Sequence, residues 1–214
     1  EIMKNEEDER FKTFRDACVW PDYPGAAANA RKPDHYINLP RNWYYIKYEK
    51  CVESDTCLFT AIRQDESVLK NPNSSNEDKL ESLKCLGHWI GDIHQPLHIS
   101  FKDDRGGNEI ELKNGIGCNK KLHAVWDTCI FEDQLKEDGF TTDSDGREKY
   151  GKYLQSTITQ SQRDQWTSEL SLTKWAEESL TIARKQKFSI ASLMERNADI
   201  LKTMKFTTNI SKMA

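Results

Sequence analysis

The sequence contains no long apolar run and no excess of positive charge. No stretch of its 214 residues approaches about 18 consecutive apolar residues, so a membrane span is not predicted. Lysine and arginine number 31 against 35 aspartates and glutamates, which gives a net charge of -4. This balance argues against a protein that coats nucleic acid through bulk positive charge, so any contact with nucleic acid should be local and chemical.

A signal peptide and a thiolate zinc motif are also lacking. The first ten residues, EIMKNEEDER, are polar, as in a mature or truncated form. None of the six cysteines has C-x-x-C spacing, so a zinc site built from thiolates is not expected. Their even number favours disulfides and an exported protein over reduced core thiols. Cys51 and Cys57 flank a short polar loop and are the expected pair; Cys118–Cys129 and Cys18–Cys85 follow by exclusion.

The hydrophobic pattern is mainly helical. Helices are expected over residues 1–20, 55–70, 76–94 and 121–136, and two or three more should lie between the polar loop at residues 138–149 and the C-terminus. Residues 21–50 hold four of the six prolines and should be irregular. A short β-hairpin is expected within residues 100–120, which contain an alternating NEIELKN. We therefore predict a mostly α protein whose residues 1–214 form a single domain.

The central stretch, CLGHWIGDIHQPLH at residues 85–98, carries the first chemical signal. His88 and Asp92 are four residues apart, so they lie about 40° apart on one face of a helix. A buried carboxylate needs a strong partner or a metal ion. Pro96 then ends the helix, and His98 follows on the new direction of the chain. The spacing His-x3-Asp-x5-His predicts a metal site.

A second His-x3-Asp pair with the same spacing occurs in LHAVWDT and consists of His123 and Asp127. Together with His98, these pairs supply imidazole and carboxylate ligands without thiolate, a set typical of catalytic zinc or a related first-row metal. The alternative interpretation is a set of separately hydrogen-bonded polar groups in the core. His94 lies on the far side of its helix from His88, so we expect a packed polar group there rather than a ligand.

A series of motifs resembles one known family, the zinc-dependent single-strand nucleases and 3′-nucleotidases of moulds, plants, trypanosomatids and bacteria. Bacterial zinc phospholipase C is a distant relative of that family. The resemblance covers about residues 17–180. The motifs are WPD at 20–22, DHYIN at 34–38, HWIGDIHQPLH at 88–98, GGN at 106–108, LHAVWDT at 122–128 and WAEES at 175–179.

The resemblance implies a helical domain of the phospholipase C and zinc nuclease type with three zinc ions. By motif, one zinc would be held by Asp22, His35, His88 and Asp92, and a second by His98, His123 and Asp127. Asp92 would bridge to a third zinc, which family members complete with an N-terminal tryptophan and a histidine five residues later. No W-x4-H pattern precedes Cys18, so the family's first helix and those ligands are not seen in this sequence. Three explanations stay open: the polypeptide is clipped, a mature N-terminal segment lies outside this sequence, or this member has lost the third site. Asp22 would also align the attacking hydroxide.

The resemblance also implies a substrate. Tyr36 would stack on a base, Asn38 would bond the base edge, and Arg105, Gly106 and Asn108 would line the same pocket. The expected activity is cleavage of single-stranded RNA and DNA and removal of 3′-phosphate from nucleotides, by a monomer that is secreted or periplasmic. The loop from Cys51 to Cys57 resembles a local disulfide of the family.

Two other functions share the same residues. A phospholipase C acting on choline lipids would use the same metals, but should expose an apolar rim around them. A non-catalytic relative with an incomplete metal site would bind nucleic acid or a partner without hydrolysis. Hydrolysis of 3′-AMP, single-stranded DNA and a choline phospholipid separates these functions.

Overall fold

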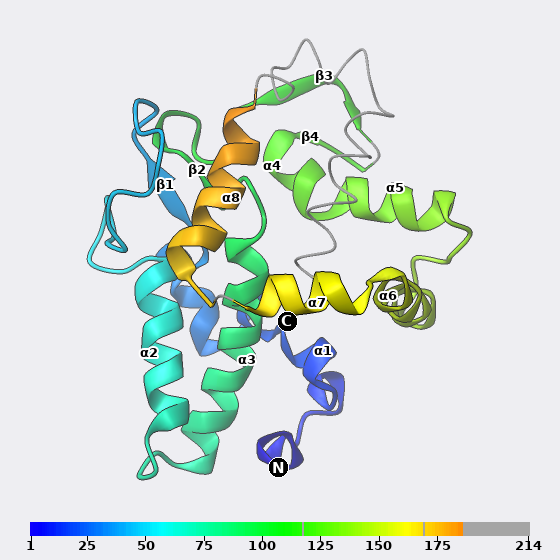
Figure 1. Cartoon of the computed structure of the whole chain (residues 1–214). Coiled ribbons are helices and arrows are strands. Elements are labelled where there is room, and N and C mark those ends of the chain that lie inside the picture. The colour runs from blue at the N-terminus through cyan, green and yellow to red at the C-terminus, as the bar shows by residue number, and fades with distance from the viewer. Residues whose placement is uncertain (117, 169, 186–214) are drawn as a thin grey trace. The chain divides into compact units, whose positions relative to one another are not determined.

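The computed structural model describes residues 1–116, 118–168 and 170–185, and they are mostly helical (Figure 1). The predicted fold class is therefore confirmed. The contacts divide the chain into two compact units. The first unit contains Glu1–Ile37 and Tyr48–Ile93, and the second contains Asn38–Lys47 and the described chain from His94 onward. That residues 1–214 act as a single domain stays a prediction.

The first unit is built on a pair of helices, α2 (Leu58–Lys70) and α3 (Asn76–Ile93), which pack side by side (Figure 1). The backbone N–H of Asp78 donates to the Ser75 hydroxyl at 3.0 Å, and this cap starts α3. Both helices lie within about three residues of their predicted bounds. Their buried side chains form the core of this unit: Leu58, Phe59, Ala61, Ile62, Cys85, Trp89 and Ile93.

The N-terminal residues do not form the single helix predicted over 1–20. They form short turns instead, because the side chains of Asp8 and Thr13 accept hydrogen bonds from the backbone N–H groups of Arg10 and Asp16. Such local bonds start a new turn and interrupt a continuous helix. The irregular, proline-rich segment that follows is confirmed. The short elements are η1 (Ile2–Asn5), η2 (Glu9–Phe11), α1 (Phe14–Ala17), η3 (Trp20–Asp22), η4 (Ala27–Ala30) and η5 (Lys32–His35).

The cysteines confirm two of the three expected pairs. Cys51–Cys57 and Cys118–Cys129 are disulfides, whereas Cys18 and Cys85 are free thiols. The Cys18–Cys85 pairing was wrong because Cys18 packs on another face of α3. A Cβ atom at Gly87 would lie 2.4 Å from the Cys18 sulfur. Cys85 is two residues from Gly87, so it points about 200° around the helix from that contact.

The second unit contains two small sheets. Strand β1 (Ile37–Leu39), which begins at the unit boundary, pairs with β2 (Ile99–Phe101). β3 (Glu111–Ile116) and β4 (Asn119–Lys121) form the predicted antiparallel hairpin, with Glu111 opposite Lys121. A short turn, η6 (Lys102–Asp104), follows β2.

The helix predicted over 121–136 is present, but it contains a π-helical turn. It consists of α4 (Leu122–Ala124), the π turn η7 (Val125–Cys129) and α5 (Ile130–Glu137). Single π turns inside α-helices are frequent at functional sites. The helix packs in a buried cluster made of Leu97, Leu112, Leu122, Val125, Trp126, Cys129, Ile130 and Ile182.

Three C-terminal helices are present, α6 (Ser144–Thr157), α7 (Gln160–Thr167) and α8 (Leu172–Arg184). Their side-chain caps explain their starting points, since Asp143, Thr159 and Ser171 each accept a backbone N–H from the first turn. Helix α6 begins inside the segment that was predicted as a loop, because Asp143 caps it there. The part of the prediction that extends beyond residue 185 lies outside the described residues. Helix α8 packs against β2. Not one helix in the described ranges combines the length and apolar composition that crossing a bilayer requires.

Candidate metal centre

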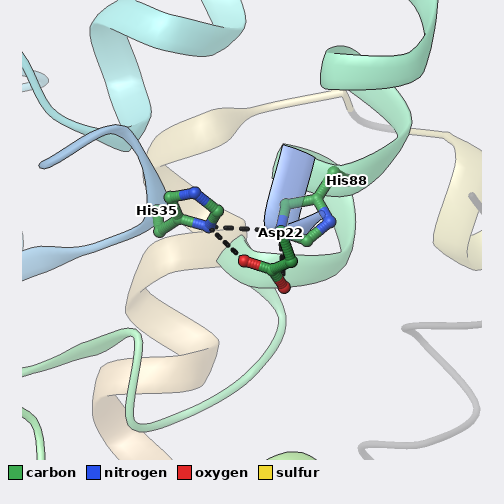
Figure 2. Close-up of side chains that lie close together, drawn as sticks. All are labelled: Asp22, His35 and His88. Carbon is green, nitrogen blue, oxygen red and sulfur yellow. Dashed lines mark hydrogen bonds and ion pairs between the residues drawn. The ribbon is translucent and has the colours of Figure 1, made fainter. Parts of the chain in front are cut away.

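The first unit brings together four predicted ligands from three segments. Asp22 ends η3, His35 ends η5, and His88 and Asp92 lie one turn apart on α3. Pro21 and Pro33 are the second residues of the two short turns, where their fixed φ angles suit the helical backbone and their missing N–H groups are not needed. Figure 2 shows the Asp22 carboxylate facing both imidazole rings. The helical spacing predicted His88 and Asp92, the family motifs predicted Asp22 and His35, and the fold places all four close together.

The donor atoms of this first group lie close together around the two imidazole nitrogens. Nε2 of His88 lies 3.1 Å from Nδ1 of His35, and one Asp92 oxygen lies 3.3 and 3.2 Å from these two nitrogens. The Asp22 oxygens lie 3.6 and 3.7 Å from the same nitrogens. Donors placed tetrahedrally at about 2.0–2.1 Å from zinc are about 3.3 Å apart. The two imidazole nitrogens and the Asp92 oxygen match this spacing, and each Asp22 oxygen lies near one of the two nitrogens, so these donors suit a zinc ion.

The protein orients His88 from the opposite side of its ring. Nδ1 of His88 donates to the Cys18 carbonyl oxygen at 2.7 Å, which leaves Nε2 as the acceptor that faces the group. Burial is the largest influence on this imidazole and favours its neutral form, but the carboxylates of Asp92 and Asp22 raise the pKa of His88 above its usual value. The field within the group thus favours positive charge, as a cation site should.

The second unit brings together His98, His123 and Asp127. His98 follows the turn at Pro96, and His123 and Asp127 lie on α4 and η7. Nε2 of His98 and Nε2 of His123 lie 3.4 and 3.3 Å from the two Asp127 oxygens. Their donor atoms all lie within 4.8 Å of one another. This second group also has the nitrogen and oxygen donors that suit zinc.

Two residues that the sequence did not single out as supports orient this second group. Nδ1 of His123 donates to the Gly106 carbonyl oxygen at 2.6 Å, and the Gln95 amide donates to Asp127 at 2.5 Å. Partial burial favours the neutral acid, but His98, His123 and Gln95 together lower the pKa of Asp127. The only sequence signal for Gln95 was its place in QPLH. For Gly106, the motif pointed to a base pocket and not to a histidine partner.

The predicted substrate residues divide between the two units. Tyr36 follows His35 in the first unit and is half-buried. Asn38, also half-buried, begins the second unit within β1. Arg105 and Asn108 are exposed in the turn around Gly106, where the Asn108 amide donates to the Arg105 carbonyl. That these five residues form one base pocket stays a prediction.

His94 lies outside both groups. It is buried, and its ring lies 5.1 Å from that of Trp175 in the second unit. This packing agrees with the interpretation of His94 as a core polar residue.

The chain is similar over most of its length to known nucleases. The family model described as S1/P1 nuclease matches residues 1–210. Endonuclease 4 and Endonuclease 1 of Arabidopsis thaliana are 37% and 35% identical over 134 and 131 residues, in each case 56% of this chain and 44% and 43% of the relative. Nuclease S1 of Aspergillus oryzae is 29% identical over 164 residues, which are 75% of this chain and 54% of that protein. The chain thus spans about half the length of these curated relatives, and it belongs to the S1/P1 nuclease family.

Proposed function

We propose that this protein is a zinc-dependent phosphoesterase that cleaves single-stranded RNA and DNA and removes 3′-phosphate from nucleotides. The observation that carries the proposal is the first group, in which two imidazole nitrogens and an Asp92 oxygen lie 3.1–3.3 Å apart and the Asp22 carboxylate lies 3.6–3.7 Å from the same nitrogens. The second His–His–Asp group supports a cluster of more than one ion. Family membership supports nuclease activity.

Each group contributes in a different way to this proposed reaction. Bound zinc would lower the pKa of a coordinated water and neutralise phosphoryl oxygens. The Asp22 side chain is 63% exposed, so its carboxylate can align an incoming water as well as hold metal. Asp127 and the two histidines of the second group would hold the ion nearest the leaving oxygen. Tyr36 would stack on the base, with Asn38, Arg105, Gly106 and Asn108 beside it.

Several finer properties belong to this proposal. Three zinc ions are expected from the family, with Asp92 as the bridging ligand. The disulfides Cys51–Cys57 and Cys118–Cys129 support an oxidising compartment, and hence a secreted or periplasmic protein. A monomer is expected, which size-exclusion chromatography with light scattering measures.

The test combines a zinc count with three substrates. The purified protein should contain zinc and hydrolyse a single-stranded oligonucleotide and 3′-AMP, but not phosphatidylcholine. His88→Ala and His123→Ala should each lower the zinc content and the rate, whereas His94→Gln, outside both groups, should keep the zinc content. Hydrolysis of the lipid alone would favour the phospholipase alternative. Bound zinc without hydrolysis would favour a non-catalytic relative, and a protein that binds no zinc would contradict the proposal.

A further inference from the structure

A buried carboxylate lies behind the first metal group and belongs to neither set of ligands. Asp65, on α2, is 3% exposed. Its Oδ2 atom accepts a hydrogen bond from Nε1 of Trp89 at 2.8 Å, and its side chain also bonds Ser82. Burial is the largest influence on this acid and raises its pKa. Burying a carboxylate at such a position costs free energy, because the charged group loses its hydration. Apolar side chains could fill the same space without that desolvation penalty.

Trp89 connects this carboxylate to the candidate ligands. The indole is fully buried, and its ring meets His35 edge-on at 4.7 Å between centroids and His88 at 5.2 Å. The interplanar angle is 87° in both contacts. The Trp89 ring therefore packs against both imidazoles and restricts how they can rotate. A buried indole has a single polar atom, so its bond to Asp65 determines which way the ring is turned.

We propose that Asp65 is a positioning residue of the first metal group, which acts through Trp89 to hold the His35 and His88 rings in the orientation that binds zinc. The inference rests on the proposed zinc site. Outer partners of histidine ligands affect metal affinity by about 10- to 100-fold when they are removed. Because Asp65 acts through a packing contact, we expect a loss near the lower end, about 10-fold.

The test measures the zinc affinity of the first group in a His123→Ala background, which disables the second group. Zinc is titrated against a chromophoric chelator. Asp65→Leu leaves the Trp89 N–H without its acceptor and should lower the affinity about 10-fold. Asp65→Asn keeps an oxygen at the same place and should retain the affinity of the background. Ser82→Ala removes only the second bond of Asp65 and should give a smaller loss, which keeps the test available if Asp65→Leu does not fold.

Leu80→Ala is the matched control for general destabilisation. Leu80 is buried on the same helix, eight residues before His88 and therefore about 12 Å away along the helix axis. It should lower the melting temperature without changing the zinc affinity. The inference is overturned if Asp65→Leu has the same zinc affinity as the His123→Ala background. It is also overturned if Asp65→Leu and Leu80→Ala lose the same stability and have the same zinc affinity. A loss in Asp65→Asn as large as that in Asp65→Leu also overturns it. A wild-type protein without zinc would instead show that the proposed function has failed.

Discussion

Nδ1 of His123 donates a hydrogen bond to the carbonyl oxygen of Gly106, a residue 17 positions earlier in the chain. Gly106 has a φ of +63°, and a Cβ atom there would lie 2.5 Å from the Leu97 carbonyl oxygen. A side chain at this position would therefore displace the backbone that orients His123. The glycine of GGN thus serves the second metal group by its backbone and by its lack of a side chain.

Gly106→Ala should lower the zinc affinity of the second group by about 10- to 100-fold, since it moves a direct partner of a proposed ligand. The measurement is a zinc titration in a His88→Ala background. Gly139→Ala is the control, because Gly139 also has a positive φ, of +85°, but has no atom within 4 Å of its Cβ position. Gly139→Ala should lower the stability of the protein but leave the zinc affinity unchanged. Equal zinc affinities in the two variants would contradict the role of the Gly106 carbonyl.

Glu6→Ala should destabilise the protein by about 3–5 kcal/mol, because it leaves a buried ammonium without its partner. Nζ of Lys84 lies 2.7 Å from the Glu6 carboxylate, and both side chains are less than 10% exposed. Denaturant unfolding measures the change. In Glu1→Ala, which breaks the exposed pair of Glu1 with Lys4, stability should not change. A Glu6→Ala variant as stable as the Glu1→Ala variant would show that the buried pair contributes nothing.

The same pair predicts a pH dependence. Burial, the largest influence, favours the neutral acid, but the hydrogen bonds from Lys84 and Asp8 and the Lys84 charge together lower the pKa of Glu6. A lowered native pKa means that the stabilisation is present above the ordinary value of 4.5 and is lost as the pH falls below it. Between pH 6 and about 3, the wild type should therefore lose more stability than Glu6→Gln. Parallel stability curves for the two proteins would refute this linkage.

Cys118→Ser should lower the free energy of unfolding by about 3 kcal/mol at most, because Cys118–Cys129 closes a loop with a sequence separation of 11. Cys118 is exposed, so the serine hydroxyl itself should change the stability little. Cys129 is less suitable for the substitution, because it is buried in the core cluster. The comparison is denaturant unfolding of the variant and of the wild type with and without reductant. A wild type that retains its full stability after complete reduction would contradict the prediction.

Tyr36→Ala should raise the KM for 3′-AMP about 10-fold, since stacking of a base on an aromatic ring contributes about 1–3 kcal/mol. Tyr36→Phe keeps the ring and should leave the KM near the wild-type value. Steady-state kinetics on 3′-AMP make the comparison. An unchanged KM in the alanine variant would remove Tyr36 from the proposed base pocket.

The sequence by itself determined the mostly helical class and the two His-x3-Asp pairs. The reason is local: residues four apart share a face of any helix, and Pro96 ends α3 wherever that helix packs. The bounds of α2 and α3 and the β3–β4 hairpin followed from the same short-range rules. The family motifs added Asp22 and His35, which periodicity alone left as ordinary loop residues.

Only the tertiary structure decided which distant groups meet. It placed the Cys18 side chain next to Gly87 and away from Cys85. The reason is that the path of the N-terminal turns over α3 depends on packing between elements. It brought Asp65 to Trp89 across 24 residues and Gly106 to His123, since no local pattern fixes the register between two helices or between a loop and a helix. The donors were visible in the sequence, but the groups that orient them were determined by packing.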